Sequence, residues 1–398
     1  MAKTSTGEIL GRYALSLAVV TPVLLFARMQ LRYLLAARPE ADWGVLLRAR
    51  LLATGATAAI LALAAQVWLP SETAALLALV GLSRAVEDVG DLLYGLRQRS
   101  HQWSRIAASQ ILRGLGGAAT VIAVSLLTGR FDTGLAANLI WQLGLTLALD
   151  ARGLRWPSGS WRAAVGTLGE CWTLGAAAAV VSLNGNLPRY ALEASVGAAA
   201  VGHYAALSQV ALLGNLPVQA MGVAALARLG ARAEQGRGPF LRLTAGLAAV
   251  SVAIGLAGVA ASWQFGARLL ALLYSPEIEA LAASLTWMMA GALCTFLTAV
   301  FGYSLVALGE RRAQLGAFGA SGLVGLAACW ALIPEHGVPG AAAANLLCWL
   351  AAATFSGAAL WIRCKSLPVA ISDCPAEEAS STLNGCSAPV RSSCSSAL

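Results

Sequence analysis

Eleven long apolar runs dominate this sequence and limit what it can fold into. A helix needs roughly 20 predominantly apolar residues to cross the hydrocarbon of a bilayer, and each run is about that long. Their approximate bounds are 10–35, 51–69, 72–94, 104–127, 132–149, 164–187, 198–226, 240–262, 279–308, 313–333 and 339–362. The pattern predicts an all-α polytopic membrane protein with about eleven transmembrane helices.

The composition excludes two other classes of protein. Hydrophobic residues make up 58% of the 398 and charged residues only 12%, about half of the roughly 25% that soluble domains carry. With a mean hydropathy of +0.70, the chain is neither a soluble globular protein nor a disordered one. The net charge of +8 comes from scattered arginines rather than from a patch, so no nucleic-acid partner is expected.

The distribution of basic residues predicts the orientation, because cytoplasmic loops carry an excess of Lys and Arg. Alternate connections contain most of them, namely Arg38, Arg48, Arg50, Arg97, Arg99, Arg105, Arg152, Arg155, Arg162, Arg228, Arg232, Arg237, Arg311 and Arg312. The opposite connections contain only Arg130, Arg189 and Arg268. We therefore expect the carboxyl end in the cytoplasm and the amino end outside.

The polar connection after residue 150 divides five predicted helices from six. We expect a five-helix bundle at 1–150, a cytoplasmic linker at 151–163, a six-helix bundle at 164–363 and a disordered cytoplasmic tail at 364–398. An odd helix count with an external amino end is unusual, so a further helix at the amino end is expected to be missing. Restoring it would give two bundles of six, the proportion of a transporter built around a midplane site.

The sequence contains no motif for enzymatic chemistry. There is no GxSxG, no P-loop and no HExxH, and the outer connections are short. The eight cysteines form no CxxC and have no metal-ligand spacing with the three histidines, so we expect free thiols. A protein that is not an enzyme, with neither cofactor nor metal, is predicted.

Charged residues inside a span are costly and therefore indicate a site or a pathway. In the third span, Arg84, Glu87, Asp88 and Asp91 recur three and four residues apart and share one helical face. We expect Arg84 to pair with Asp88 and the acidic residues to bind a cation or proton, or sugar hydroxyls. The alternative is that this end of the helix simply reaches cytoplasmic water.

Other polar residues inside the spans are candidates for contact with an anion or a polar ligand. They are Arg113 in the fourth span, Asn184, Asn186 and Arg189 at the expected outer end of the sixth, and Gln209 and Asn215 near a Gly–Pro kink in the seventh. The guanidinium fork suits phosphate because it binds two oxygens at once. The structural alternatives are snorkelling of Arg113 to the interface, ordinary turn chemistry before Pro188, and a kink that only shapes the helix.

Five segments carry a resemblance to a known family: YGLRQR at 94–99, NGNLPRY at 184–190, VGHY at 201–204, FGARLLALLY at 265–274 and IPEHGVPGAA at 333–342. In this order, over most of 10–363, the chain resembles the polysaccharide transporters, or O-antigen (Wzx-type) flippases. They are a branch of the multidrug/oligosaccharidyl-lipid/polysaccharide (MOP) exporter superfamily. The family has twelve or more helices and a cytoplasmic amino end, and this sequence departs from it in both respects.

The resemblance implies two bundles around a central cavity that opens alternately to either side of the bacterial inner membrane. The implied cargo is an undecaprenyl-diphosphate-linked oligosaccharide, a repeat unit of O-antigen, lipopolysaccharide or exopolysaccharide. Arg113 and Arg189 would contact the diphosphate, Asn184, Asn186, Gln209 and Asn215 the sugars, and Glu87, Asp88 and Asp91 a coupling ion. The implied partners are membrane lipid and, with the same pathway, a polysaccharide polymerase and glycosyltransferases.

Two alternatives stay open at this point. One is a cation-coupled drug or metabolite antiporter of the same superfamily, in which the acidic face around Asp88 would bind the coupling ion. The other is a membrane polymerase or ligase that joins glycans, although such chemistry usually requires a sizeable outer loop.

Overall fold

The computed structural model describes residues 7–32, 35, 42–68, 71–152, 159–274 and 276–367. In these residues the regular structure is entirely helical: α1 (Gly7–Arg28), α3 (Trp43–Trp68), α4 (Ser71–Arg99), α5 (Trp103–Ile111), α6 (Gly117–Thr128), α7 (Phe131–Leu145), α8 (Trp161–Ser195), α9 (Ala198–Leu212), α10 (Asn215–Glu234), α11 (Arg237–Leu273), α12 (Pro276–Glu279), α13 (Ala282–Ala307) and α14 (Arg311–Cys364). Two π-helical turns, η1 (Leu112–Gly116) and η2 (Thr146–Asp150), follow α5 and α7. Nearly all of the predicted tail lies outside the described residues.

Each of the eleven predicted spans overlaps at least one of these helices. The last two fall on α14, which Gly337 interrupts with a φ of 57° and a ψ of −126°. By length and composition six helices are able to cross a membrane, or up to eight if each of two bent helix pairs counts as one span. The chain is therefore an all-α, multi-pass membrane protein, and the exact number of spans stays a prediction.

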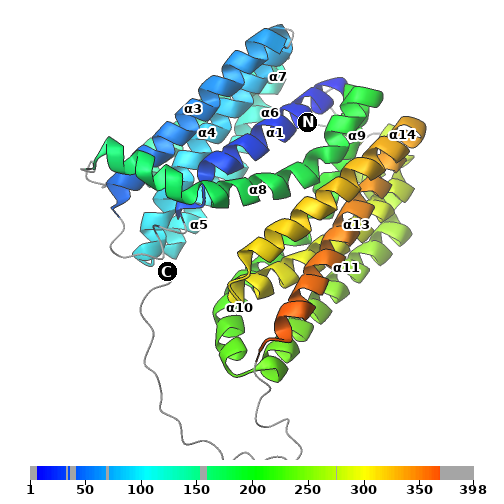
Figure 1. Ribbon diagram of the computed structural model, residues 1–398. Coiled ribbons are helices and arrows are strands. Elements are labelled where there is room, and N and C mark those ends of the chain that lie inside the picture. Colours follow the sequence, from blue (N-terminus) through cyan, green and yellow to red (C-terminus); the bar gives the residue numbers. More distant parts are fainter. Residues whose placement is uncertain are drawn as a thin grey trace, which may run out of the picture.

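The helices form two bundles with α1 and α8 between them (Figure 1). One bundle contains α3 to α7, and the other contains α9 to α14. The amino-terminal part of α8 contributes Ala164 and Cys171 to a core with α3 and α4, whereas Leu192 near its other end belongs to the core of the second bundle. Helix α8 is thus shared, and the division of the chain at residue 150 remains a proposal.

Helix α1 is likewise shared, because its faces contact both bundles. Its residues Val20 and Leu24 pack in a core with α3, α4, α6 and α7, and Ala14 packs in the core of the second bundle. At Gly11 the backbone lies against the carbonyl group of Ala198 in α9, where a Cβ atom would overlap that group. The close approach of α1 and α9 brings the two bundles together around the cavity described below.

Several helices extend beyond their predicted ends, and α8 and α11 show this most clearly. Helix α8 continues through Pro188 to Ser195, and α11 continues to Leu273 rather than to 262. The expectation that residues 182–190 form the end of a helix is therefore wrong. The predicted break in the seventh span is confirmed, since α9 and α10 meet at an angle of 46° between Leu212 and Asn215.

Candidate functional site: a basic cavity between the bundles

A cavity of about 680 Å³ lies between the two bundles. One face of α1 forms a long wall, because residues three and four apart point to the same side of a helix. That wall consists of Leu10, Tyr13, Ala14, Leu17, Thr21, Leu24, Leu25 and Arg28. The remaining lining residues are Arg84 of α4, Arg189 of α8, Ala205, Ala206, Gln209 and Leu212 of α9, and Tyr274 after α11. Most of this surface is apolar, with three guanidinium groups set into it.

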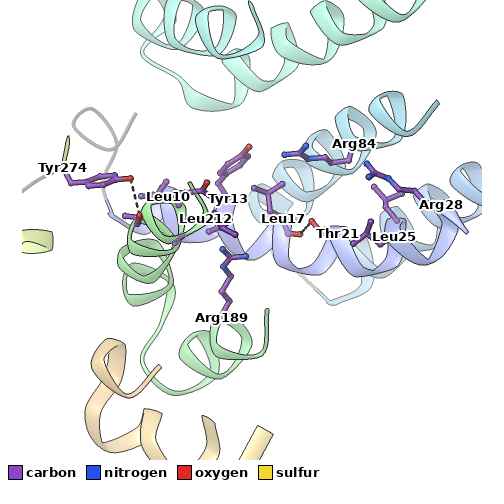
Figure 2. A pocket seen from close by; sticks show the side chains of 15 residues that line it. Leu10, Tyr13, Leu17, Thr21, Leu25, Arg28, Arg84, Arg189, Leu212 and Tyr274 are labelled. Atoms are coloured by element: carbon purple, nitrogen blue, oxygen red, sulfur yellow. Dashed lines mark hydrogen bonds between the residues drawn. The ribbon is translucent and has the colours of Figure 1, made fainter. Parts of the chain in front are cut away.

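Figure 2 shows how the three arginines are distributed. Arg28 and Arg84 lie together where α1 approaches α4, and Arg189 reaches in from α8 toward Leu17 and Leu212. At another edge Tyr274 donates a hydrogen bond to the carbonyl of Ala206, at 3.3 Å. The cavity therefore has cationic groups on both of its sides.

The acidic face of α4 is paired with arginines in this conformation. Glu87 binds Arg84 at 2.6 Å, and Asp91 binds Arg32 at 2.9 Å. Asp88 is fully buried and binds Nε of Arg28 at 2.5 Å. The expected pairing of Arg84 with Asp88 is therefore wrong, because Asp88 faces α1 and Arg84 turns to the residue three positions along its own helix.

Arg189 differs from the other two cavity arginines. Its Nη1 donates to Oδ1 of Asn186 at 2.6 Å and its Nη2 donates to the Ser208 hydroxyl at 3.0 Å. Both partners are neutral, and no carboxylate in the described part of the chain forms an ion pair with Arg189. Its Nε is buried without a hydrogen-bond partner among these residues. Arg189 is thus a cation that two neutral groups hold at the cavity wall, with no acidic partner in the described part of the chain.

The two predicted amides of α8 do not line this cavity. Asn184 is buried and donates to the carbonyl of Phe318 at 2.8 Å and to the hydroxyl of Ser321 at 3.2 Å. Asn186 donates to the carbonyl of Ser182 at 2.8 Å while it accepts from Arg189. Asn184 therefore joins α8 to α14, and Asn186 positions Arg189.

The two predicted amides of the seventh span lie in different places. Gln209 lines the cavity on α9. Asn215 begins α10 at the bend, outside the cavity lining, and its Oδ1 is buried without a hydrogen-bond partner in the described residues. The structure therefore brings together Arg84, Arg189 and Gln209 from the predicted set.

Arg113 lies inside the first bundle, where it pairs with an acidic residue. It donates to Oδ2 of Asp150 at 2.7 Å, to Gln142 at 2.9 Å and to the Thr146 hydroxyl at 3.0 Å. Arg113 belongs to η1, and both Thr146 and Asp150 belong to η2. These partners hold the guanidinium inside the bundle, which contradicts the alternative that Arg113 snorkels to the interface. Arg113 does not line the large cavity, and its contact with an anion stays a prediction.

A second cavity, of about 270 Å³, lies between α1, α4 and η1. Its lining residues are Arg28, Glu87, Asp91, Tyr94, Gln110, Arg113 and Gly114. Arg28 lines both cavities and thus stands at the boundary between them. Within the described residues no group of three or more His, Cys, Asp or Glu side chains is arranged to hold a metal ion.

Sequence reasoning missed the cavity residues Tyr13, Arg28 and Tyr274. Arg28 carried a usable signal, since it is a charge inside the apolar run at 10–35. Tyr13 and Tyr274 carried none, because an aromatic residue within or beside an apolar span is usually packed like any other.

This arrangement of helices occurs in solved transporter structures. An inward-facing multidrug resistance MATE family transporter of the MOP superfamily matches 90% of this chain and 89% of its own, with a TM-score of 0.66 and 14% identity. The lipid II flippase MurJ, in an inward closed conformation, matches 89% of this chain and 82% of its own, with a TM-score of 0.71 and 10% identity.

A third example is a MOP superfamily transporter from Pyrococcus furiosus. It matches 90% of this chain and 86% of its own, with a TM-score of 0.61 and 15% identity. No protein-family model matches the sequence, and no curated protein sequence matches it. The fold is therefore that of the MOP superfamily transporters, which include both drug exporters and a lipid flippase.

Proposed function

We propose that this chain is a MOP-superfamily transporter that moves a lipid-diphosphate-linked oligosaccharide across the bacterial inner membrane by alternating access. The observation that carries the proposal is Arg189, a cation at the cavity wall without an acidic partner in the described residues. A cation in a low-dielectric site favours an anionic ligand, because the ligand supplies the missing counter-charge.

The chemistry of the cavity fits an amphipathic anion. Guanidinium groups bind phosphate oxygens through two parallel N–H donors, and Arg28, Arg84 and Arg189 all reach the cavity. Gln209 provides an amide for sugar hydroxyls. The volume of about 680 Å³ lies in the range of about 300–1,000 Å³ that ligand sites commonly have.

The wider setting belongs to the same proposal. The cargo would be made by glycosyltransferases on the cytoplasmic side and consumed by a polysaccharide polymerase outside, as for an O-antigen or exopolysaccharide repeat unit. The positive-inside distribution supports a cytoplasmic carboxyl end. The bundles on either side of α1 and α8 would rock about the cavity.

The proposal is tested in a strain that lacks the gene, by measuring undecaprenyl-linked glycan at the cytoplasmic face. Wild-type protein should relieve the accumulation, Arg189→Gln should fail to do so at an equal protein level, and Arg189→Lys should retain part of the activity. Arg130→Gln is the matched control, because Arg130 lies on the surface and pairs with Asp132 at 2.6 Å. Full activity of Arg189→Gln would contradict the role of Arg189, and a strain without accumulation would contradict the cargo.

A second candidate is a cation-coupled drug or metabolite antiporter. The likeness to multidrug resistance MATE transporters supports it, as does the buried Oδ2 of Asp88, which has no hydrogen-bond partner in the described residues. Against it, the three acidic residues of α4 are already paired with arginines. Drug susceptibility of the deletion strain separates the two functions, since only the antiporter predicts a change that is independent of glycan synthesis.

A further inference from the structure

Arg50 is an unusual residue of the first bundle. It lies on α3, its exposed fraction is 0%, and none of its three guanidinium nitrogens has a hydrogen-bond partner among the described residues. Leaving a buried charged group without a partner is strongly unfavourable. Such a group is expected to have a partner in at least one conformation of the protein.

The complementary group is Asp88. Helix α3 packs on α4 at this level, because Leu46, Leu47 and Ala49 share a core with Leu92. The packing brings Arg50 within electrostatic range of Asp88 and Asp91, and Asp91 already binds Arg32 at 2.9 Å. Asp88 uses only Oδ1, which accepts from Nε of Arg28 at 2.5 Å, while its Oδ2 is buried without a partner in the described residues. A buried carboxylate oxygen on α4 and a buried guanidinium on α3 thus lie on two packed helices with no hydrogen bond between them.

Arg28, the present partner of Asp88, is the residue of these three that can move. Its side chain is 34% exposed, in contrast to 0% for Asp88. It also lines both the large cavity and the smaller one. Arg28 therefore has access to a ligand in the cavity, whereas Asp88 and Arg50 do not.

We propose that Arg50 is a positioning residue that serves as the second partner of Asp88. In the conformation described, Asp88 holds Arg28. In the alternative conformation, Asp88 pairs with Arg50, and Arg28 is released to bind an anionic group in the cavity. The coupling of this exchange to cargo rests on the proposed function, but the exchange of partners does not.

The exchange lowers the free-energy cost of moving Arg28 from Asp88 to an anion in the cavity. Without Arg50, an anion that draws Arg28 away would leave Asp88 as an unpaired buried charge. With Arg50 present, Asp88 keeps an ion pair in both conformations. An anion that binds better when Arg28 is free shifts the population toward the Asp88–Arg50 pair.

The first test is a double-mutant cycle on thermal unfolding of the purified full chain in detergent. Because either arginine can pair with Asp88, Arg28→Gln and Arg50→Gln together should lower the Tm by more than the sum of the single shifts. In an Asp88→Asn background this excess should vanish. Arg28→Gln with Arg97→Gln is the matched control, because Arg97 donates to the carbonyls of Leu149 and Asp150, and its effects should add. Additive shifts for Arg28 and Arg50 would overturn the inference, as would an excess that persists in the Asp88→Asn background.

The second test measures the affinity for undecaprenyl diphosphate in the same detergent. Arg50→Gln should weaken binding about tenfold, equivalent to about 1.4 kcal/mol, and Arg50→Lys should restore most of it. Adding Asp88→Asn to Arg50→Gln should also restore affinity, because Arg28 is then free. Unchanged affinity in Arg50→Gln would overturn the coupling to the cavity. If wild-type protein does not bind this probe, the proposed function fails, while the double-mutant cycle still decides the exchange of partners.

Discussion

The buried pair of Arg113 and Asp150 provides the sharpest prediction of stability. The side chains are 10% and 1% exposed, and the charged atoms are 2.7 Å apart. Asp150→Asn keeps the shape of the side chain and removes its charge, so that Arg113 becomes a buried cation with only neutral partners. The variant therefore isolates the charge from the packing.

The expected cost follows from the geometry. Two unit charges at this separation attract by about 6 kcal/mol at an effective dielectric constant of about 20. Arg113 keeps its bonds to Gln142 and Thr146, which offset part of that loss. Breaking a buried pair from one side usually costs about 3–5 kcal/mol, and we expect Asp150→Asn to lie near the lower end.

The assay is thermal unfolding of the purified protein in detergent. Asp150→Asn should lower the Tm clearly, whereas Asp132→Asn, which breaks the exposed pair with Arg130, should leave it unchanged. The double variant Arg113→Leu with Asp150→Leu should be more stable than Asp150→Asn, because neither residue of this pair then leaves an unpaired buried charge. A Tm of Asp150→Asn equal to that of wild type would refute the reasoning.

Three further variants probe individual contacts. Asn184→Leu should lower the Tm, with a loss of about 1–3 kcal/mol from the unsatisfied groups on α14, and should leave the affinity for undecaprenyl diphosphate unchanged in the folded fraction. Gly11→Leu should separate α1 from α9 at Ala198, so that the variant no longer relieves glycan accumulation in the deletion strain. A variant that relieves it fully would contradict this close approach. Tyr94→Phe removes the hydrogen bond to the Ser109 hydroxyl, at 2.8 Å. It should lower the free energy of unfolding by about 1 kcal/mol, and an unchanged Tm would contradict this.

Much of the helix arrangement along the chain was predictable. Hydropathy located the long helices, because a lipid-facing helix must be apolar over its whole length, while the number of helices that cross the membrane stays a prediction. It was less reliable at helix ends, since α8 continues through Pro188 to Ser195 where the polar segment suggested a turn. Helix α8 packs against both bundles along its length. Such packing acts on where the helix ends, and no local feature of the sequence indicates it.

The candidate site was predictable only in part. Arg189 was identified because a guanidinium gathers there with two amides, a set that suits a phosphate or a sugar, and the structure places it at the cavity. Asn184 was chosen for the same reason, but it serves to join α8 to α14. Residue type alone does not distinguish an amide that faces a cavity from one that satisfies a backbone carbonyl in a neighbouring helix.

The sequence by itself determined that this chain forms apolar helices in a membrane, because the length of each run and the spacing of the arginines reflect the thickness and charge preferences of the bilayer. The tertiary structure alone decided which charges meet. Asp88 pairs with Arg28, which is 60 positions away, rather than with Arg84 on its own helix. Such pairs depend on how α1, α3 and α4 face one another, and helical periodicity fixes only which residues share a face within one helix.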